Sequence, residues 1–334
     1  MPDETAAAPP ELRRNSLTGE YVIVAPARGR RPHSQPLERE KHPVPRYDPD
    51  CPLCPGNESE TPPPLLVLQG DEDGGEWSVR VVPNRYPVVA PGHGGPGSTD
   101  GVATGAHEVL VETPRHDLDL PDRGVDSVAQ MLEALHQRLQ ALEQRRGTQH
   151  VIAFKNRGRE AGTSLDHPHS QIMALDFLPP VVRRRVALAR RFYRRSGRCA
   201  LCALIEDERR NGARLVFEMD GFIALTSFAG DSPGEALLVP LRHAASFSES
   251  YDMLPQHSRA LHELMTRNRD ALDDPPYNLV LHGAPVRALD DPALHWFWQL
   301  SPRGTIAAGF ELGTGVLVNP LPPEEAAAML RRAD

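Results

Sequence analysis

The sequence has few aromatic residues, few cysteines and no long apolar run. Aromatic residues make up 5% of its 334 residues, and it contains only four cysteines. So few cysteines exclude a small extracellular scaffold held together by disulfides. No stretch approaches the roughly 18 consecutive apolar residues of a membrane-spanning helix, and the first residues lack the basic and apolar segments of a signal peptide. We therefore expect a cytoplasmic protein with no membrane partner.

An excess of positive charge is also missing. The chain has 37 Lys and Arg against 45 Asp and Glu, which gives a net charge of −8. A protein that coats nucleic acid needs a basic surface, and neither cysteine pair is flanked by a cluster of basic and aromatic residues. We therefore expect no nucleic-acid partner. A local basic pocket for a phosphorylated small molecule is still compatible with this charge.

The chain contains enough apolar residues, 40%, to build a sizeable core. Residues 1–12 are acidic and rich in Ala and Pro, which predicts a disordered tail. Strand-like runs occupy 78–82, 107–112, 151–154 and 277–281. Apolar residues at three- and four-residue steps predict helices over 128–142 and 256–272. An arginine-rich helix is expected over 183–195, either as a solvated basic face or as a helix that binds phosphate or RNA.

The second half of the chain repeats the first. Each half begins with a CxxC pair, followed by a strand-like run that ends in a histidine, a helix, a second strand and another histidine. From His116 to His167 is 51 residues, and from His243 to His295 is 52. Such a register indicates an internal duplication. We expect an α+β fold with two tandem halves, residues 13–180 and 181–334, each a mainly antiparallel sheet with helices.

Each half supplies four residues of the types that bind zinc. Structural zinc takes four tetrahedral sulfur and nitrogen ligands, and two cysteines separated by two residues can point both sulfurs into one site. A single CxxC could also be an idle thiol pair or a redox pair, but two pairs with similarly spaced histidines favour metal. We expect two zinc sites, formed by Cys51, Cys54, His116 and His167 and by Cys199, Cys202, His243 and His295.

The run His167-Pro168-His169-Ser170-Gln171 predicts a nucleophile. In an extended segment residues i and i+2 face the same side, so His167 can bind metal while His169 meets a substrate. A backbone carbonyl that accepts from Nδ1–H would leave Nε2 of His169 free to attack phosphorus. Gln171 lies on the same face, and its amide could donate to a phosphate oxygen as charge builds up. The alternative is that His-x-His is only a metal-binding pair.

Three small residues precede this run: Gly162, Thr163 and Ser164. Small residues allow the backbone to approach a ligand closely, and their N–H and hydroxyl groups are donors of the kind that phosphate requires. Taken alone, an ordinary surface turn is the better explanation of these three residues. Their place before His169 makes them candidates for binding substrate.

These features resemble the galactose-1-phosphate uridylyltransferase family of the histidine-triad superfamily, over nearly the whole chain. The similar segments are 14–19, 26–32, 82–87, 154–158 and the His-Pro-His-Ser-Gln run. The resemblance implies two histidine-triad-like halves, a nucleotidyl intermediate on His169, zinc on His116 and His167 with the first cysteine pair, and a homodimer. The substrate contacts that it implies are made by Gln171, Asn156, Gly162 and Ser164 to phosphates, Arg28 and Arg31 to phosphates or sugar, and Asn84 to the nucleoside.

Three features depart from typical members of this family. His295-Trp296-Phe297 stands where they carry His-Trp-His, and Cys199 and Cys202 add a second CxxC. Residues 310–315 and 318–320 replace the segment with which they hold the hexose. These departures resemble the branch that includes ADP-glucose phosphorylase, which moves AMP to phosphate or a similar anion.

We therefore expect a ping-pong nucleotidylyltransferase of carbohydrate metabolism. Its partners would be a nucleoside-diphosphate sugar and a sugar 1-phosphate or inorganic phosphate, most simply in UDP-glucose–hexose-1-phosphate exchange of galactose metabolism. An adenylyltransferase of the ADP-glucose phosphorylase type is one alternative. A histidine-triad hydrolase that uses water as the acceptor, or a zinc-dependent binding module, is another.

Overall fold

The computed structural model describes residues 8–30, 44–70, 77–92, 101–304 and 307–333. Within these residues, eleven strands form one large sheet and three form a small one. The strands, in chain order, are β1 (Glu11–Arg14), β2 (Tyr21–Val24), β3 (Leu66–Leu68), β4 (Val79–Pro83), β5 (Ala90–Pro91), β6 (Thr104–Val111), β7 (His150–Arg157), β8 (His169–Leu175), β9 (Leu215–Met219), β10 (Phe222–Thr226), β11 (Ala236–Pro240), β12 (Tyr277–His282), β13 (Phe297–Pro302) and β14 (Leu317–Asn319).

The helices occupy the connections between strands and the C-terminal region. The α-helices are α1 (Val125–Glu143), α2 (Pro180–Ser196), α3 (Ala200–Asn211), α4 (Leu254–Ala271), α5 (Gly309–Thr314) and α6 (Pro323–Arg332). The short 3₁₀ helices are η1 (Pro26–Arg30), η2 (Glu58–Glu60), η3 (Leu120–Asp122), η4 (Arg159–Ala161), η5 (Phe247–Glu249), η6 (Tyr251–Met253) and η7 (Val286–Ala288). In the part of the chain that the structure describes, no helix is both long and apolar enough to span a bilayer.

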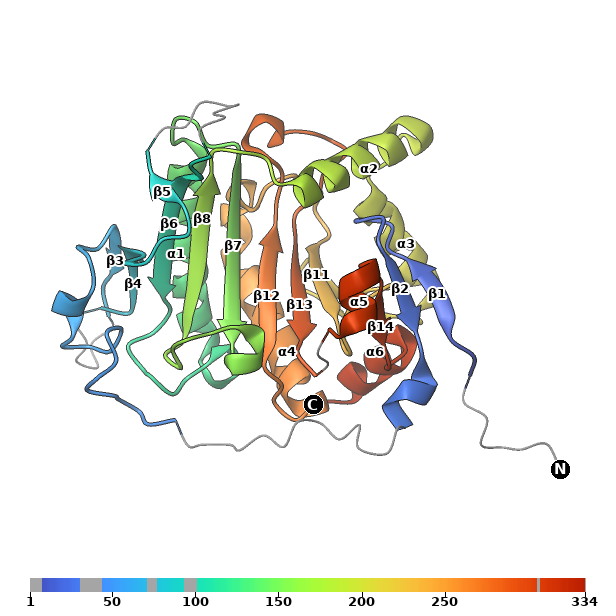
Figure 1. Cartoon of the computed structure of the whole chain (residues 1–334), viewed down its shortest axis with the longest axis horizontal. Coiled ribbons are helices and arrows are strands. Elements are labelled where there is room, and N and C mark those ends of the chain that lie inside the picture. Colours follow the sequence, from blue (N-terminus) through green and yellow to red (C-terminus); the bar gives the residue numbers. More distant parts are fainter. Residues whose placement is uncertain (1–7, 31–43, 71–76, 93–100, 305–306, 334) are drawn as a thin grey trace.

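The strand order of the large sheet is symmetrical. It runs β3-β4-β6-β8-β7-β12-β13-β11-β10-β9, so each first-half strand on this path has a counterpart at the same distance from the β7–β12 junction (Figure 1). Registers match as well across this junction. Gln171 of β8 pairs with Phe154 of β7, Phe154 pairs with Val280 of β12, and Val280 pairs with Gln299 of β13. All pairings on this path are antiparallel, whereas β5 pairs with β6 in parallel. The expected α+β duplication is confirmed.

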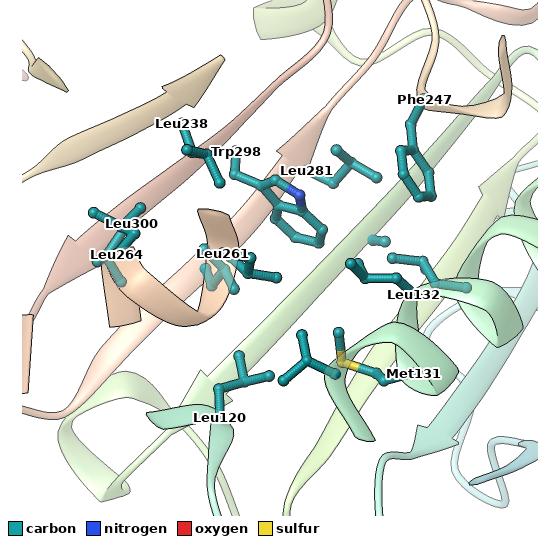
Figure 2. Packing of buried hydrophobic residues seen from close by; sticks show 14 of the residues in the cluster. Leu120, Met131, Leu132, Leu238, Phe247, Leu261, Leu264, Leu281, Trp298 and Leu300 are labelled. Atoms are coloured by element: carbon teal, nitrogen blue, oxygen red, sulfur yellow. The ribbon is translucent and has the colours of Figure 1, made fainter. Parts of the chain in front are cut away.

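One face of the sheet is covered by α1 and α4 (Figure 1), which are the two helices expected from their apolar spacing. Alternate strand residues point to this face, where they meet the apolar sides of both helices. Figure 2 shows Leu281, Trp298 and Leu300 of the strands packed with Leu132 and Leu261 of the helices. The sheet packs on this shared core with one face, and His169 lies on the opposite face.

The N-terminal segment packs on the far half of the molecule. Strand β2 pairs with β1 on one side and in parallel with β14 on the other. The prediction of a disordered tail is wrong for Glu11 and Leu12. These residues pair with Val24 and Ile23, and the hydrogen bonds of this ladder satisfy their backbone groups. Residues 1–7 lie outside the described residues. The division of the chain at residue 180 stays a prediction, since the start of the chain pairs with its end.

Candidate functional site

His169 is the first residue of β8, and its imidazole is held in one tautomer. Its Nδ1 lies 2.8 Å from the carbonyl oxygen of His167, which can only accept, so Nδ1 carries the proton. No described residue forms a hydrogen bond with Nε2 of His169. Burial lowers the pKa of His169, although the bond to His167 opposes that shift. The ring is therefore a neutral imidazole with a free Nε2 lone pair, as the sequence predicted.

His169 opens into a cavity of about 610 Å³. Gln171, Asn84 and Ser164 also line this cavity, so three other predicted residues lie around the predicted nucleophile. Its opposite wall comes from the segment between the first cysteine pair and β3. The remaining lining residues are Pro49, Asp50, Pro52, Leu53, Asn57, Glu60, Thr61, Pro62, Val82, Pro83, Arg85, Tyr86, Val109 and Leu165. We call this space the catalytic cavity.

A histidine that the sequence analysis missed orients Gln171. The Nδ1 atom of His107 accepts from the backbone N–H of Val88 at 3.2 Å, so its proton is on Nε2. That Nε2–H donates to Oε1 of Gln171 at 2.8 Å. The amide NH₂ group of Gln171 is thereby left for a ligand. The available signal was alternation on β6, because His107 shares a strand face with Val109, the partner of Gln171.

The other predicted substrate residues are placed less directly. Asn156 of β7 lies on the same face of the sheet as Phe154, the residue that pairs with Gln171. The Oδ1 atom of Asn156 accepts a hydrogen bond from Asn278 at 2.7 Å. Thr163 donates its hydroxyl to the carbonyl of Leu165 at 2.9 Å. Gly162, with φ of +89°, ends η4. Asn156, Gly162 and Thr163 are not among the residues that line the catalytic cavity, so their phosphate contacts remain predictions.

Arg28 lies far from His169 in the same chain. It belongs to η1, directly after β2, and β2 and β8 lie in different halves of the molecule (Figure 1). A nearby charge is Glu311 in α5, whose pKa is lowered by backbone hydrogen bonds and, to a smaller extent, by Arg28. Arg31 lies outside the described residues. One copy of the chain therefore does not bring Arg28 to the catalytic cavity.

Buried charged residues lie behind β8, the strand that begins with His169. On the helix-covered face, the carboxylate of Glu112 accepts from Ser170 at 2.7 Å, Lys155 at 3.0 Å and Arg123 at 3.0 Å. Burial alone would raise the pKa of Glu112, but the two cations lower it, so the carboxylate is ionised. Asp119 is the second anion near Lys155, at 3.0 Å. Sequence periodicity did not reveal this cluster, because its members come from four separate segments.

The first predicted metal set forms a compact, buried cluster. Cys51, Cys54, His116 and His167 each offer a ligand atom, and these atoms lie within 4.8 Å of one another. The Nε2–H of His167 donates to the carbonyl of Thr113 at 2.9 Å, which leaves Nδ1 facing Cys54 Sγ at 3.5 Å. Such an outer hydrogen bond is typical of a metal-binding histidine. The cluster could hold a metal ion, with all four side chains buried.

The second predicted set forms a similar cluster nearer the surface. Cys199, Cys202, His243 and His295 offer ligand atoms within 4.8 Å of one another, with His243 exposed. Nδ1 of His295 lies 3.5 Å from Cys202 Sγ and 4.0 Å from Cys199 Sγ. The buried Nε2 of His295 has no hydrogen-bond partner among the described residues. The cluster could hold a metal ion, but without the outer hydrogen bond that supports His167.

Known proteins share both this fold and these sequence features. The family model for the N-terminal domain of galactose-1-phosphate uridyl transferase matches residues 2–62 and 100–179. The galactose-1-phosphate uridylyltransferase of Thermotoga maritima is 30% identical, over 97% of this chain and 98% of that protein. The chain belongs to the galactose-1-phosphate uridylyltransferase family. The predicted enzyme class, nucleotidylyltransferase, is confirmed.

Other members of the family are similar over comparable lengths. The ADP-glucose phosphorylase of Arabidopsis thaliana is 32% identical, over 96% of this chain and 92% of that protein. A crystal structure of the Arabidopsis ADP-glucose phosphorylase with bound ADP-glucose covers 97% of this chain and 99% of that one, with a TM-score of 0.82 and 29% identity. A uridylyltransferase structure has a TM-score of 0.72 and 30% identity, over 97% and 98% of the two chains.

The structure shows where this chain departs from the family pattern expected for the second half. Phe297 occupies on β13 the position that His169 occupies on β8, because Gln299 and Gln171 pair with Val280 and Phe154, which themselves pair across the junction. A phenyl ring has no lone pair with which to attack phosphorus. One half of this family member can therefore carry a histidine nucleophile, and the other cannot.

Proposed function

We propose that the chain transfers a nucleotidyl group from a nucleoside-diphosphate sugar to a second acceptor, through a covalent intermediate on His169. The leading substrates are UDP-glucose and a hexose 1-phosphate such as galactose 1-phosphate. One observation carries the proposal: His169 is neutral, fixed by its bond to His167, and open at Nε2 to a cavity of about 610 Å³. An imidazole in this state is a competent nucleophile.

The chemistry needs no other nucleophile. Nε2 of His169 attacks the α-phosphorus, the Nε2–P bond forms, and the P–O bond to the sugar 1-phosphate breaks. The leaving group departs as an anion. In the second half-reaction an acceptor phosphate oxygen attacks the same phosphorus, and the Nε2–P bond breaks. The carbonyl of His167 stabilises the positive ring during the intermediate, because it accepts from Nδ1–H at 2.8 Å.

Gln171 is the residue best placed to stabilise the phosphoryl group. His107 holds Oε1 of Gln171, so its NH₂ group can donate to a non-bridging oxygen on which charge develops. Ser164 and Asn84 line the same cavity and offer donors to the phosphates and to the nucleoside. Asn156, Gly162 and Thr163 would contact phosphates from the β7 side, where the backbone of Gly162 leaves open space.

A second candidate function uses an adenine nucleotide and inorganic phosphate as the acceptor. Two observations favour it: Phe297 replaces a histidine in the second half, and Cys199 and Cys202 complete a second Cys₂His₂ cluster. Both features resemble the ADP-glucose phosphorylase branch, of which an Arabidopsis member is 32% identical. Arg85 and Tyr86 line the catalytic cavity and are well placed to meet the base.

We further propose that both Cys₂His₂ clusters bind zinc. Their two thiols and two imidazoles match the ligands of structural zinc. Bound zinc would join Cys51 and Cys54 to His116 and His167, and so hold the backbone carbonyl that fixes His169. Zinc would act there as a structural ion, while His169 performs the chemistry.

The active enzyme is proposed to be a homodimer. Arg28 cannot reach the catalytic cavity of its own chain, but a second copy could present it there. Exposed apolar side chains occur near both places: Tyr86 beside the cavity, and Phe310 and Leu312 on α5 near Arg28. In a twofold-symmetric dimer, the surface around Tyr86 in each copy would contact the α5 surface of the other copy. Both groups of exposed apolar side chains would then be buried.

The test is a trapped intermediate. The protein is incubated with UDP-glucose or ADP-glucose labelled at the α-phosphate, and protein-bound label that is acid-labile and base-stable is counted. We expect label on the wild-type chain, none on His169→Ala, and normal labelling of His262→Ala, a histidine variant on α4. Label from ADP-glucose alone would select the second candidate function. An unlabelled protein with both sugar nucleotides would refute nucleotidyl transfer.

A further inference from the structure

The second half contains a counterpart of the catalytic cavity. A cavity of about 340 Å³ lies over β13, lined by Phe297 and Gln299, which occupy the register positions of His169 and Gln171. His282 also lines it, at the end of β12 beside Phe297. We call this space the second cavity. The second half therefore retains a ligand-sized cavity, although it has no histidine at the nucleophile position.

A cation in the second cavity lacks an anionic partner. Arg185 of α2 lines the cavity and makes no ion pair with a carboxylate among the described residues, although its neighbour Arg184 pairs with Glu20. Its contacts are with Nδ1 of His282 and with the ring of Phe297, whose centroid is 5.8 Å from Cζ. A guanidinium stays charged and can only donate. It therefore has donors left for an anion.

A histidine also orients Gln299, although it lies on β12, whereas His107, which orients Gln171, lies on β6. Because Arg185 donates to Nδ1 of His282, the proton of that ring is on Nε2. Nε2–H then donates to Oε1 of Gln299 at 2.8 Å. The NH₂ group of Gln299 is left for a ligand, as it is in Gln171. His150, only 2% exposed, lines the same side of the cavity, and its Nδ1 has no partner among the described residues.

The other side of the second cavity is acidic. Asp231 and Glu235 line it just before β11, together with Ser227, which directly follows β10. Glu235 accepts from the backbone N–H of Asp231 at 3.1 Å, while the buried Oδ1 atom of Asp231 has no hydrogen-bond partner among the described residues. Burial and the neighbouring Asp231 raise the pKa of Glu235 well above its usual value. The free Oδ1 atom of Asp231 is an acceptor for a hydroxyl group. The cavity therefore has a cation, Arg185, on the β12 side and an unsatisfied acceptor on the β10 side.

We infer that the second cavity binds a sugar phosphate without turning it over. The phosphoryl group would accept from Arg185 and Gln299, and the sugar hydroxyls would donate to Asp231 and Glu235. Such a ligand satisfies both the unpaired Arg185 and the free Oδ1 acceptor of Asp231, which a polyanion without hydroxyl groups would not. With Phe297 in the nucleophile position, the phosphate ester stays intact. The inference does not depend on what His169 transfers.

Equilibrium dialysis with radiolabelled glucose 1-phosphate tests this binding. We expect two sites per chain in the wild type, one in the catalytic cavity and one in the second cavity. Arg185→Gln should weaken one of them roughly 10- to 100-fold, because it removes a charged donor to phosphate. Arg190→Gln is the matched control, since Arg190 lies on the same helix and pairs with Asp291. It should retain both sites.

Two further measurements keep the result interpretable. Arg185→Lys should recover part of the lost affinity, and the urea-unfolding midpoint of Arg185→Gln should match that of the wild type, which shows that the variant is folded. Equal site counts and affinities in Arg185→Gln and Arg190→Gln would overturn the inference. Equal affinity of the Arg185-dependent site for inorganic phosphate and glucose 1-phosphate would contradict the sugar contacts.

Discussion

At the scale of single residues, the catalytic cavity depends on paired side chains in which one orients the other. The carbonyl of His167 fixes the ring of His169, and Nε2–H of His107 fixes the amide of Gln171. Neither orienting group needs to touch the substrate. A substitution of an orienting residue should therefore change the rate of the chemical step more than it changes substrate binding.

His107→Phe tests this orientation. Without the donor to Oε1, Gln171 can turn its carbonyl toward the phosphate, so kcat should fall roughly 10- to 100-fold with little change in KM. His107→Asn, which keeps a side-chain donor, should recover part of the rate. In a Gln171→Ala background the His107→Phe substitution should cost little more, because the residue through which it acts is gone. A full additional loss in that background would contradict the positioning role.

At the scale of elements, the core between the sheet and its two helices contains a histidine that tolerates no charge. His257 of α4 is 1% exposed, and Nε1–H of Trp298 on β13 donates to its Nε2 at 2.8 Å. Burial lowers the pKa of His257 to about 3. A proton on Nε2 would face the indole N–H. The contact between α4 and β13 therefore requires the neutral ring.

This contact predicts acid sensitivity. In the unfolded chain His257 titrates near its usual value of about 6.5, so below that pH the unfolded state binds a proton that the folded state does not. The free energy of unfolding should fall as pH drops from about 6.5 to 4, by on the order of 3 kcal/mol from this residue. Urea titrations of His257→Gln should show a shallower loss. His262→Gln, on the same helix, should keep the full loss.

The two Cys₂His₂ clusters join different elements and should respond differently to mutation. The first joins the segment before η2, the loop after β6 and the segment just before β8. The second joins the start of α3, the loop after β11 and the segment just before β13. Cys54→Ala should lower both stability and His169 labelling, since His167 carries the carbonyl that holds His169. Cys199→Ala should mainly lower stability, by at least about 3 kcal/mol, because bound zinc supplies folding energy.

Metal analysis accompanies these two variants. The wild type should contain two equivalents of zinc per chain, and each variant should lose one. The measurements are metal content, urea-unfolding midpoints and labelling per folded chain. Retention of two equivalents by either variant would show that its cluster does not bind the metal.

At the scale of the whole molecule, one sheet runs through both halves, with β7 paired to β12 at the junction (Figure 1). The halves therefore cannot move as separate domains without breaking that ladder. Arg28 stays on the side of β2 and β14, away from His169. If Arg28 takes part in catalysis, it must do so in a second copy of the chain.

A complementation experiment distinguishes an Arg28 that acts in its own chain from an Arg28 that acts in a second copy. His169→Ala and Arg28→Ala should each have little activity alone. After the two variants are mixed under conditions that exchange subunits, roughly a quarter of the wild-type rate should return, because half of the dimers are mixed and each holds one complete site. Activity that stays at the level of the separate variants would show that Arg28 does not act across a dimer interface.

Much of this architecture follows from local sequence patterns. Alternation and three- and four-residue spacing act within one segment, so 151–154, 277–281 and the helices at 128–142 and 256–272 were predicted near their observed places. The CxxC pairs and the His-Pro-His run also carry their geometry locally, because a tight turn and an extended strand fix the directions of neighbouring side chains. The same spacing repeated twice was enough to predict the duplication.

Contacts between distant segments could not be predicted from local sequence patterns. The pairing of His107 with Gln171, the buried position of Glu112 between Lys155 and Arg123, and the pairing of β2 with β14 each join residues far apart in the chain. The sequence alone determined the candidate nucleophile, the eight metal-ligand candidates and the two-half fold, since these depend on short-range spacing. Only the tertiary structure decided how Gln171 is oriented, where Arg28 lies and that a second cavity exists, because those depend on which strands become neighbours.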